Sequence, residues 1–349
     1  KSTVESFVDL LNKIKEKTNI NVYDSSIMIV SGNTTMTHFL LGINPWTIFQ
    51  SPFTPVFNES GFIKGKEIGI PIKGYVYCFP SVANYFGGDL VSGLLYTEIY
   101  KKNEISALID IGTNGELVIG NNDFLVAAAG AAGPALEGGI SKFGMRACSG
   151  AIDSIKIINN EIIYTTINNE EPKGICGSGI VDLISELFLN KWIDFSGNLI
   201  PENSMSIIKL DDEDAVEYVC KEKSFNGESL IFTQNDINQF LTTKSAAHTM
   251  VAYLLEEIGL SLDDLECFYV AGAFGTHLNL KSAVTIGMYP DLDDNKIICP
   301  GNTSLKGAYT LLTNRELLKE VEKIKNKIQY LQLSNATDFV GKMRAASFI

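Results

Sequence analysis

The sequence predicts an α/β protein of two lobes. Short apolar runs typical of strands alternate with amphipathic segments of helical period, which is the pattern of α/β proteins. The chain has 349 residues, 45 % of them hydrophobic, and is long enough for two domains or one two-lobed domain. GNTTM at 32–36 is echoed by GNTSL at 301–305, each after a strand-like run and at the start of an amphipathic segment. The repetition indicates two related halves.

The first hundred residues predict three helices and two strands. Residues 3–16 have helical period, and the apolar run 25–30 predicts a strand. The next helix is expected to be capped by Asn33 or Thr34 and to end at Gly42 with Pro45. After a loop-rich stretch over 46–74, residues 75–79 predict a strand, and the segment through 90–100 predicts a helix.

The middle of the chain predicts a meander of strands and then a buried helix. Apolar runs at 107–111, 116–120 and 124–129 are separated by turns, and 154–167 predicts a further hairpin. The helix through 174–189 is expected to be capped by Ser178. The acidic stretch 190–228 predicts an irregular, solvated excursion. Thr233 with Asp236 is a capping-box pattern that starts the next helix.

The last hundred residues predict strands that lead into glycine turns. Residues 267–272 form an apolar run before a glycine turn, and the segment 296–312 predicts strand, turn and helix. A charged helix is expected over 315–327.

Composition excludes several classes of function. The formal charge is −13 and Lys and Arg form no run, so a basic nucleic-acid-binding face is not expected. The six cysteines form no C-x-x-C pair, which argues against a zinc or local iron–sulfur site. No apolar stretch is long enough to span a bilayer, and the first residues predict an amphipathic helix instead of a signal peptide. We therefore expect a cytoplasmic, soluble protein.

Glycine turns carry the chemistry. Backbone N–H groups in such turns make ready anion sites, and glycine lets a phosphate approach the main chain closely. In ALIDIGTNGELVIG at 107–120, one charged residue, Asp110, stands in the apolar run before the turn. A carboxylate beside a phosphate cradle can hold Mg²⁺ or orient water. The alternative is that Asp110 only caps the turn. No Walker motif and no G-x-G-x-x-G is present.

Taken together, these motifs resemble the superfamily of acetate and sugar kinases, heat-shock chaperones and actin (ASKHA). LIDIGTNGELVIG is similar to its second phosphate motif, and FYVAGAFGTHLN is similar to its adenosine motif. More narrowly, SGNTTMTHFLLGINP, PSVANYFGGD, AAAGAAGPALEGGISKFGMRA, GICGSGIVDLI and GNTSLKGA resemble ATP-dependent reductive activators of corrinoid proteins, in the expected order along nearly the whole chain.

The resemblance implies a two-lobed actin-like, ribonuclease-H-like ATPase fold whose first lobe is partial. Residues 1–104 would form the partial first lobe, and 105–300 a second lobe with the phosphate and adenosine motifs. Residues 301–349 would form a C-terminal helix and tail that return toward the first lobe.

The resemblance also implies ATP and Mg²⁺ as cofactors and assigns site residues by position. Asp110 would hold Mg²⁺, and Glu116 is a second candidate for metal or water; both are the catalytic candidates. The residues expected to bind the nucleotide lie in the glycine turns: Gly112, Thr113, Asn114 and Gly115 at the phosphates, Gly272, Ala273, Phe274 and Gly275 at the adenosine, and Gly177, Ser178, Gly179, Asn33 and Thr34 in the other turns.

Two parts of the family pattern have no counterpart in these residues. The family begins with a ferredoxin-like domain that holds a two-iron, two-sulfur cluster on four cysteines, and a first phosphate motif similar to D-I-G-T-T-T lies upstream of the GNT turn. We therefore expect a C-terminal portion or a truncated relative, with the iron–sulfur cluster in a segment absent from this chain.

The leading prediction is the ATP-binding portion of an activator that returns a corrinoid methyltransferase protein from Co(II) to Co(I), with a corrinoid protein as partner and a possible homodimer. One alternative is a small-molecule kinase of the same superfamily, which needs a base between the lobes. The other is a non-catalytic dimerisation or partner-docking module.

Overall fold

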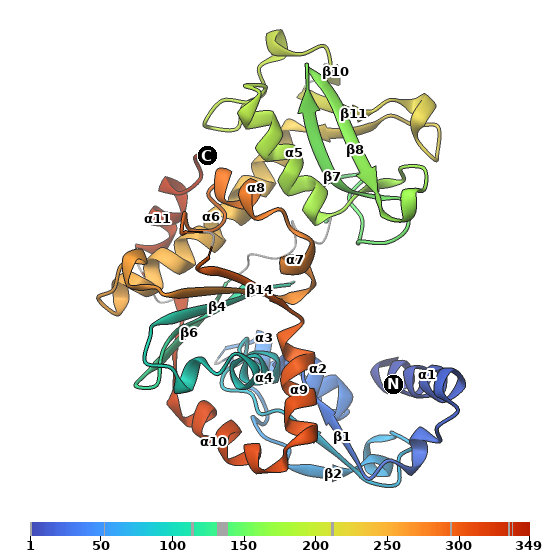
Figure 1. Cartoon of the computed structure of the whole chain (residues 1–349), viewed down its shortest axis with the longest axis vertical. Helices are drawn as coiled ribbons and strands as arrows, with labels where there is room; N and C mark the ends of the chain where they lie inside the picture. Colours follow the sequence, from blue (N-terminus) through green and yellow to red (C-terminus); the bar gives the residue numbers. More distant parts are fainter. Residues whose placement is uncertain are drawn as a thin grey trace. The chain divides into compact units, whose positions relative to one another are not determined.

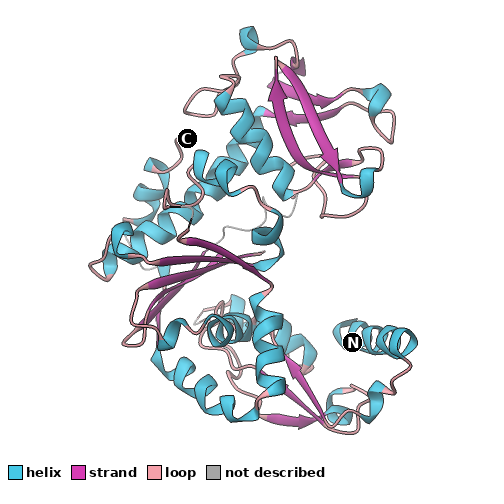
Figure 2. Ribbon diagram, viewed as in Figure 1, coloured by secondary structure: helices cyan, strands magenta, loops and turns pink. Residues whose placement is uncertain are grey.

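A computed structural model describes residues 2–51, 53–112, 115–130, 139–210, 213–293, 295–333, 336 and 338–349 (Figures 1 and 2). The chain divides into two compact units. Unit 1 comprises Lys1–Leu108, Val118–Ala128 and Asn302–Leu331. Unit 2 comprises Ile109–Leu117, Ala129–Gly301 and Gln332–Ile349. The chain therefore passes between the units several times, whereas the sequence predicted boundaries near 104 and 300.

Unit 1 is built on a small three-stranded sheet. Its order is β1-β3-β2, with β1 (Ile27–Val30) parallel and β2 (Phe62–Lys64) antiparallel to β3 (Tyr75–Cys78). The helices of its first part are α1 (Ser2–Thr18), α2 (Thr34–Leu40), α3 (Trp46–Phe49) and α4 (Gly88–Thr97). Apolar residues of α1 pack on the buried core of this sheet and α2, which explains the helical period at the start of the sequence.

The C-terminal part of unit 1 returns to the same core. It consists of α9 (Thr303–Thr313), α10 (Leu318–Lys327) and β15 (Ile328–Leu331). Helices α4 and α9 lie side by side (Figure 1). A Cβ added at Gly307 would lie 1.9 Å from the Ser92 carbonyl oxygen, so only glycine permits this approach of the two helices.

The two GNT repeats meet beside α4. Ser31, just before the first repeat, donates to the Gly88 carbonyl (3.0 Å), and its Oγ lies 2.6 Å from Ser92 Oγ and 2.7 Å from Ser304 Oγ in the second repeat. Both repeats cap their helices in the same way, since Asn33 accepts from the Met36 N–H and Asn302 accepts from the Leu305 N–H. The repeated sequence therefore corresponds to one strand–turn–helix motif that occurs twice in the chain.

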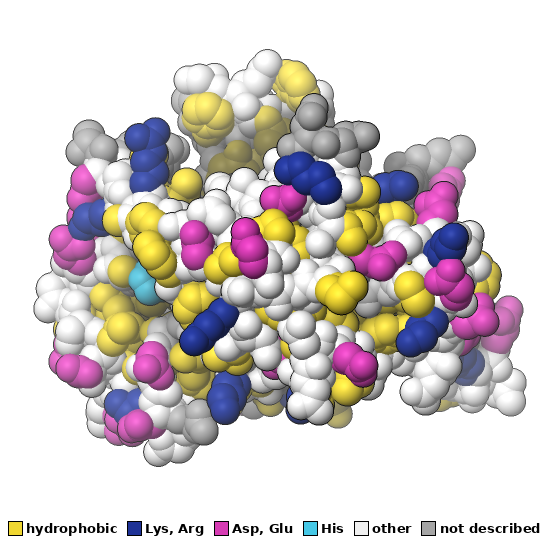
Figure 3. Space-filling view, turned by 90° about the horizontal axis from the view of Figure 1, so that it is seen from above, with side chains coloured by type: hydrophobic (Ala, Val, Ile, Leu, Met, Phe, Trp, Pro, Cys, Tyr) yellow, Lys and Arg dark blue, Asp and Glu magenta, His cyan; other side chains and the backbone are white. Residues whose placement is uncertain are grey.

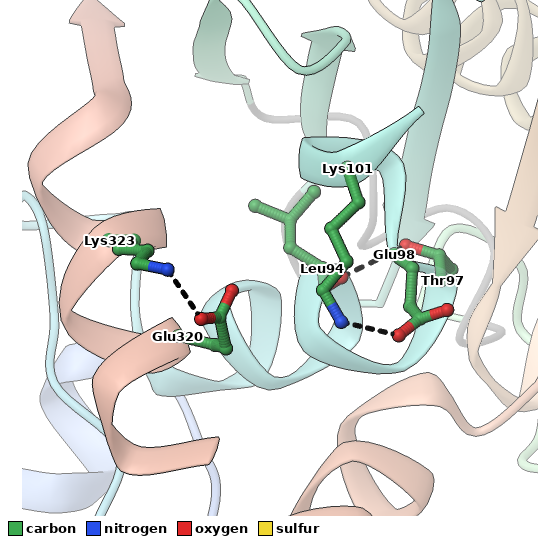
Figure 4. Close-up of polar contacts among 6 residues, drawn as sticks. All are labelled: Leu94, Thr97, Glu98, Lys101, Glu320 and Lys323. Carbon is green, nitrogen blue, oxygen red and sulfur yellow. Dashed lines mark hydrogen bonds and ion pairs between the residues drawn. The ribbon is translucent and has the colours of Figure 1, made fainter. Parts of the chain in front are cut away.

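Two separate ion pairs lie near the end of α4 (Figure 4). Glu98 takes a left-handed conformation (φ 56°), and its N–H donates to the Leu94 carbonyl (3.0 Å). Its carboxylate pairs with Lys101 at 2.7 Å, and on α10 Lys323 pairs with Glu320 at the same distance. Exposed pairs of this kind contribute about 0–1 kcal/mol each, so α4 is held mainly by its buried apolar face.

The largest sheet has six strands in the order β14-β13-β4-β5-β6-β15. Its strands are β4 (Ser106–Ile111), β5 (Gly115–Gly120), β6 (Leu125–Gly130), β13 (Cys267–Ala271) and β14 (Ile297–Gly301), with β15 as above. The division between the units runs through β4, β5 and β6. β13 pairs with β14, and β6 with β15, in parallel. The continuous apolar runs of β4 and β5 are buried, as expected for strands covered on both faces.

Unit 2 adds two three-stranded sheets, β8-β7-β9 and β10-β11-β12. Their strands are β7 (Ala151–Ile158), β8 (Glu161–Thr166), β9 (Gly174–Ile175), β10 (Ile207–Leu210), β11 (Glu213–Val219) and β12 (Leu230–Thr233). The helices are α5 (Gly177–Leu189), α6 (Gln234–Glu257), α7 (Gly272–His277), α8 (Leu280–Thr285) and α11 (Phe339–Ala345). Buried Asp182 of α5 accepts hydrogen bonds from Ser154 Oγ (2.8 Å) and Ser282 Oγ (2.6 Å), which ties α5 to β7 and α8.

The C-terminal segment is held on α6 by a buried lysine. Lys244 is 3 % exposed, and its Nζ donates to the carbonyls of Ala346 (2.9 Å) and Phe348. Burial lowers the pKa of Lys244 to about 8. The Phe195 and Phe348 rings also pack together, with centroids 5.9 Å apart. Two main-chain oxygens thus replace the water that solvates an exposed ammonium group.

Two predicted features of unit 2 were wrong and one was confirmed. The stretch 190–228 is not wholly irregular, because β10 and most of β11 pair antiparallel within it despite their charges. Ser178 does not cap α5: the residue before the helix is Cys176, with no side-chain cap. The capping box of Thr233 and Asp236 at the start of α6 is present with both of its hydrogen bonds.

Candidate functional site

Strand β4 delivers Asp110 to the end of a buried run. Ala107, Leu108 and Ile109 are fully buried, whereas Asp110 is only partly buried and is followed by Ile111 and the turn. Burial raises the pKa of Asp110 to about 6. The ionised carboxylate is therefore held at a cost that a cation or a set of donors from a ligand would offset.

Strand β13 delivers the second glycine turn to the same carboxylate. Gly272 directly follows β13 and has φ +89°, a conformation that L side chains rarely adopt. A Cβ at this position would lie 2.7 Å from Asp110 Oδ1. The structure thus brings together two motifs that are far apart in the sequence, within unit 2. We call Asp110 with Gly272 the Asp110 cradle.

Gly275, the other glycine of the turn after β13, has a role in packing. A Cβ at Gly275 would lie 2.5 Å from the Val270 carbonyl oxygen, so this glycine lets α7 pack on β13. The backbone of Ala273 and Phe274 belongs to α7, while their side chains lie outside the described part of the structure. The assignment of these residues to an adenosine site stays a prediction.

Gly112, which follows β4, has open space around it among the described residues. A Cβ at Gly112 would meet no described atom within 4 Å, and the residue is exposed. Thr113 and Asn114 lie outside the described residues. Gly115 begins β5 and is buried there, and Glu116 is 6 % exposed on the same strand. Packing against described neighbours therefore does not explain the glycine at 112, and its predicted role at the phosphates stays a prediction.

The third predicted glycine turn serves packing. A Cβ at Gly179 would lie 2.5 Å from the Ile152 carbonyl oxygen of β7, and Gly177 and Ser178 are buried at the start of α5. Ser178 Oγ lies 3.4 Å from Cys176 Sγ. These contacts account for small residues here without a ligand, so their predicted binding role stays a prediction.

Asn33 and Thr34 are engaged within unit 1. Asn33 accepts from the Met36 N–H at 2.9 Å, and buried Thr34 donates to the Ala83 carbonyl at 2.8 Å. Nearby His38 is buried, with Nδ1 2.8 Å from the Thr34 carbonyl oxygen. The side chains of the first GNT turn thus shape the fold, and their predicted contact with a nucleotide stays a prediction.

Among the described residues, no three His, Cys, Asp or Glu side chains gather in a way that could hold a metal ion. Mg²⁺ is commonly held by one or two carboxylates together with phosphate oxygens and waters, so a single carboxylate such as Asp110 fits that chemistry. The glycine at 272 also suits a magnesium site. Any other residue here would place its Cβ against the Asp110 carboxylate oxygen that would bind the ion.

The surface carries both signs of charge. On the face shown in Figure 3, Lys and Arg side chains are dispersed among Asp and Glu and do not gather in one patch. Over the parts of the chain that the structure covers, no helix is both long enough and apolar enough to cross a bilayer.

Comparison with known proteins defines the class and then the family. Residues 104–349 match a family described as the C-terminal domain of RACo, the ASKHA domain, and residues 1–102 match the RACo middle region. The actin-like ASKHA fold that the sequence predicted is therefore confirmed. The chain belongs to the RACo family, which confirms the predicted resemblance to reductive activators of corrinoid proteins.

The individual relatives agree with this family assignment. The chain is 31 % identical over 347 residues to the corrinoid activation enzyme RamQ of Eubacterium limosum, covering 97 % of the chain and 58 % of RamQ. It is 27 % identical over 309 residues to the [Co(II) methylated amine-specific corrinoid protein] reductase of Methanosarcina barkeri, covering 82 % and 52 %. A solved reductive activator for corrinoid, iron-sulfur protein matches with TM-score 0.90 and 38 % identity, over 99 % of this chain and 56 % of that one. The chain thus spans a little over half the length of these relatives.

Proposed function

We propose that this chain is the ATP-binding portion of a reductive activator that returns a corrinoid protein from Co(II) to Co(I). The relatives are a corrinoid activation enzyme, a Co(II) corrinoid protein reductase and a reductive activator. The observation that supports the proposal at the level of residues is the Asp110 cradle, in which Asp110 of β4 lies close to Gly272, the residue that directly follows β13.

The chemistry of the cradle suits a phosphate ligand with a cation. Asp110 would hold Mg²⁺, which when bound would neutralise charge on the phosphate oxygens. Burial makes ionisation of the Asp110 carboxylate costly without a partner, as its raised pKa indicates, so a bound cation would stabilise the ionised form. Gly272 keeps the carboxylate accessible, and Gly112 leaves the main chain open to a ligand. Glu116 is proposed as a second carboxylate of the site.

The proposed reaction combines the transfer of one electron with the hydrolysis of one nucleotide. A low-potential one-electron donor reduces Co(II) to Co(I), and ATP with water gives ADP and phosphate. We propose that nucleotide binding biases the conformation that fits the corrinoid protein. The electron carrier is proposed to be an iron–sulfur cluster held by residues outside those of this chain. A cytoplasmic location and a homodimer are further parts of the proposal.

The function is tested with a corrinoid protein held as Co(II), Mg·ATP and a chemical one-electron reductant that takes the place of the proposed iron–sulfur cluster, with Co(I) followed by its absorbance. We expect formation of Co(I) to need both this chain and ATP, and to fall at least tenfold with Asp110→Ala. Gly227→Ala, in an open loop of the same unit, is the control and is expected to form Co(I) at the wild-type rate. Formation of Co(I) at the same rate without ATP would contradict the proposal.

A further inference from the structure

One segment of unit 1 exposes a group of large apolar side chains. Single exposed apolar side chains are ordinary on protein surfaces, whereas a group of them marks a site of interaction. Six such side chains lie within residues 36–56, and each is between 43 % and 59 % exposed: Met36, Phe39, Trp46, Phe49, Phe53 and Val56. We call these six residues the α2–α3 face, and all of them belong to unit 1.

Helical spacing turns these side chains outward in pairs. Met36 and Phe39 are three residues apart on α2 and therefore share one side of that helix. Trp46 and Phe49 have the same spacing on α3, and Ile48 between them is fully buried and anchors the helix. The core of unit 1 thus uses other side chains of these helices and leaves the two pairs in solvent.

Buried His38 holds the parts of the segment together. Its ring packs on Phe57 with centroids 4.5 Å apart, and its Nε2 accepts from the Val56 N–H at 3.3 Å. Its main-chain carbonyl accepts from the Ile43 N–H at 2.9 Å, in the connection between α2 and α3. The loop that ends at Val56 and the start of this connection are therefore both held at α2, so the exposed side chains belong to one local surface.

The segment that forms this surface has no formal charge. Residues 25–58 contain no Asp, Glu, Lys or Arg, although 20 % of the residues of the chain are charged. The buried centres of protein–protein interfaces are depleted of charged residues and enriched in aromatic residues and Met. The composition of the α2–α3 face is therefore that of an interface centre.

Charge favours a second copy of the chain as the partner. In a two-fold symmetric dimer a surface faces the same surface of the other copy, so a charged surface would repel itself. The chain carries a formal charge of −13, and two copies repel one another over most approaches. An uncharged apolar face is the surface on which that repulsion is smallest and the gain from burial is largest.

The exposed area is sufficient for a weak dimer. Large apolar side chains carry about 150–250 Å² each, so six that are half exposed present roughly 500–600 Å². Two such faces together would bury about 1,000–1,200 Å², which is the lower end of the range for specific interfaces. A contact of this size against like net charges is expected to have a Kd in about the micromolar range.

We infer that the α2–α3 face is the surface through which two copies of this chain form a symmetric dimer. The inference rests on the homodimer that the proposed function includes, and it names the surface that forms it. Nucleotide binding and corrinoid reduction do not enter the inference, so their tests are separate from the test of this surface.

The two tryptophans of the chain make the contact measurable in the wild-type protein. Trp46 is 59 % exposed and Trp192 is 1 % exposed, so quenching of tryptophan fluorescence by acrylamide reports on Trp46. Between about 0.5 μM and about 100 μM chain, we expect the quenching to fall at least twofold. Sedimentation velocity over the same range should show monomer converting to dimer.

Variants locate the surface. Phe39→Ser and Phe49→Ser each remove a half-exposed ring and are expected to raise the dimer Kd about tenfold, with an unchanged far-UV circular dichroism spectrum. Met205→Ser is the matched control, because Met205 is 98 % exposed in unit 2, and it should leave Kd within about twofold. Added NaCl is expected to lower the wild-type Kd, because it screens the repulsion between the two copies.

Three results would overturn the inference. A wild-type chain that stays monomeric, with Trp46 fully quenched at every concentration, removes the homodimer and leaves nucleotide binding and corrinoid reduction to their own tests. A dimer whose Kd does not change in Phe39→Ser and Phe49→Ser, or whose formation leaves Trp46 quenched, forms through another surface. Protection of Trp46 only when a corrinoid protein is added would assign the face to that partner in place of a second copy.

Discussion

Gly272→Ala is the most informative single change at the cradle, because two separate costs can be read from the structure. Gly272 has φ +89°, and an L residue held in a left-handed conformation costs about 1–2 kcal/mol. The new Cβ would also lie 2.7 Å from Asp110 Oδ1, well inside contact distance. Forcing an extra methyl group into a packed site costs about 1–3 kcal/mol. We therefore expect a loss of about 2–5 kcal/mol in the free energy of unfolding and loss of nucleotide binding.

The assay is urea denaturation of five proteins: wild type, Gly272→Ala, Asp110→Ala, the double variant with both changes, and Gly227→Ala. Gly227 has φ +67°, and a Cβ there would meet no described atom within 4 Å, so its variant reports the backbone cost alone. In the double variant the clash is removed, and a coupling of about 1–3 kcal/mol is expected between the two sites. Equal losses for Gly272→Ala and Gly227→Ala, or no coupling to Asp110, would refute the described cradle.

Further consequences follow from the packing and the charges. The pKa of Lys244 is about 8 in the folded chain and about 10.4 unfolded, so the unfolded state binds more protons between these values and stability rises with pH across that window. Urea denaturation at pH 7.5 and 9.5 should show a gain of about 2 kcal/mol that Lys244→Met lacks; equal pH dependence of the two proteins would contradict the burial of this charge. Gly307→Ala should cost about 3 kcal/mol or more, because its Cβ would lie 1.9 Å from the Ser92 carbonyl oxygen and would separate α4 from α9. Gly341→Ala, on α11 with open space around it, should be neutral or stabilising by up to about 1 kcal/mol, and thermal melting that ranks these two variants otherwise would count against the packing described.

Local sequence patterns predicted the local structure well. The apolar runs around Asp110 became the buried strands β4, β5 and β6, and the pattern Thr233-x-x-Asp236 became a complete capping box. Asn33 caps its helix as expected. Each of these features is decided by neighbours a few residues away, which is the range over which period and capping chemistry operate.

Predictions failed where packing overrode local chemistry. Ser178 follows a glycine at the start of α5, where close approach to β7 needs small residues, and the helix begins before the serine can cap it. The charged segment from Glu213 was predicted to be solvated, yet it forms the strand β11, in which the neighbours Ala215 and Val216 are fully buried. The run of charges concealed this buried strand, because its burial does not follow the period-two pattern of a half-exposed strand.

The sequence predicted the residues of the candidate site only in part, and it did not predict which of them lie close together. Asp110 and Gly272 were each predicted, but their contact joins segments far apart in the chain and follows from the neighbouring strands β4 and β13.

The measurement that tests the central claim most directly is calorimetric titration of this chain with Mg·ATP and with a non-hydrolysable analogue, repeated for Asp110→Ala. The account expects saturable binding of both ligands, weakened at least tenfold by the loss of the carboxylate. Wild-type affinity in Asp110→Ala, or no binding by the wild-type chain at millimolar nucleotide, would contradict the claim that the Asp110 cradle of this chain is a nucleotide site.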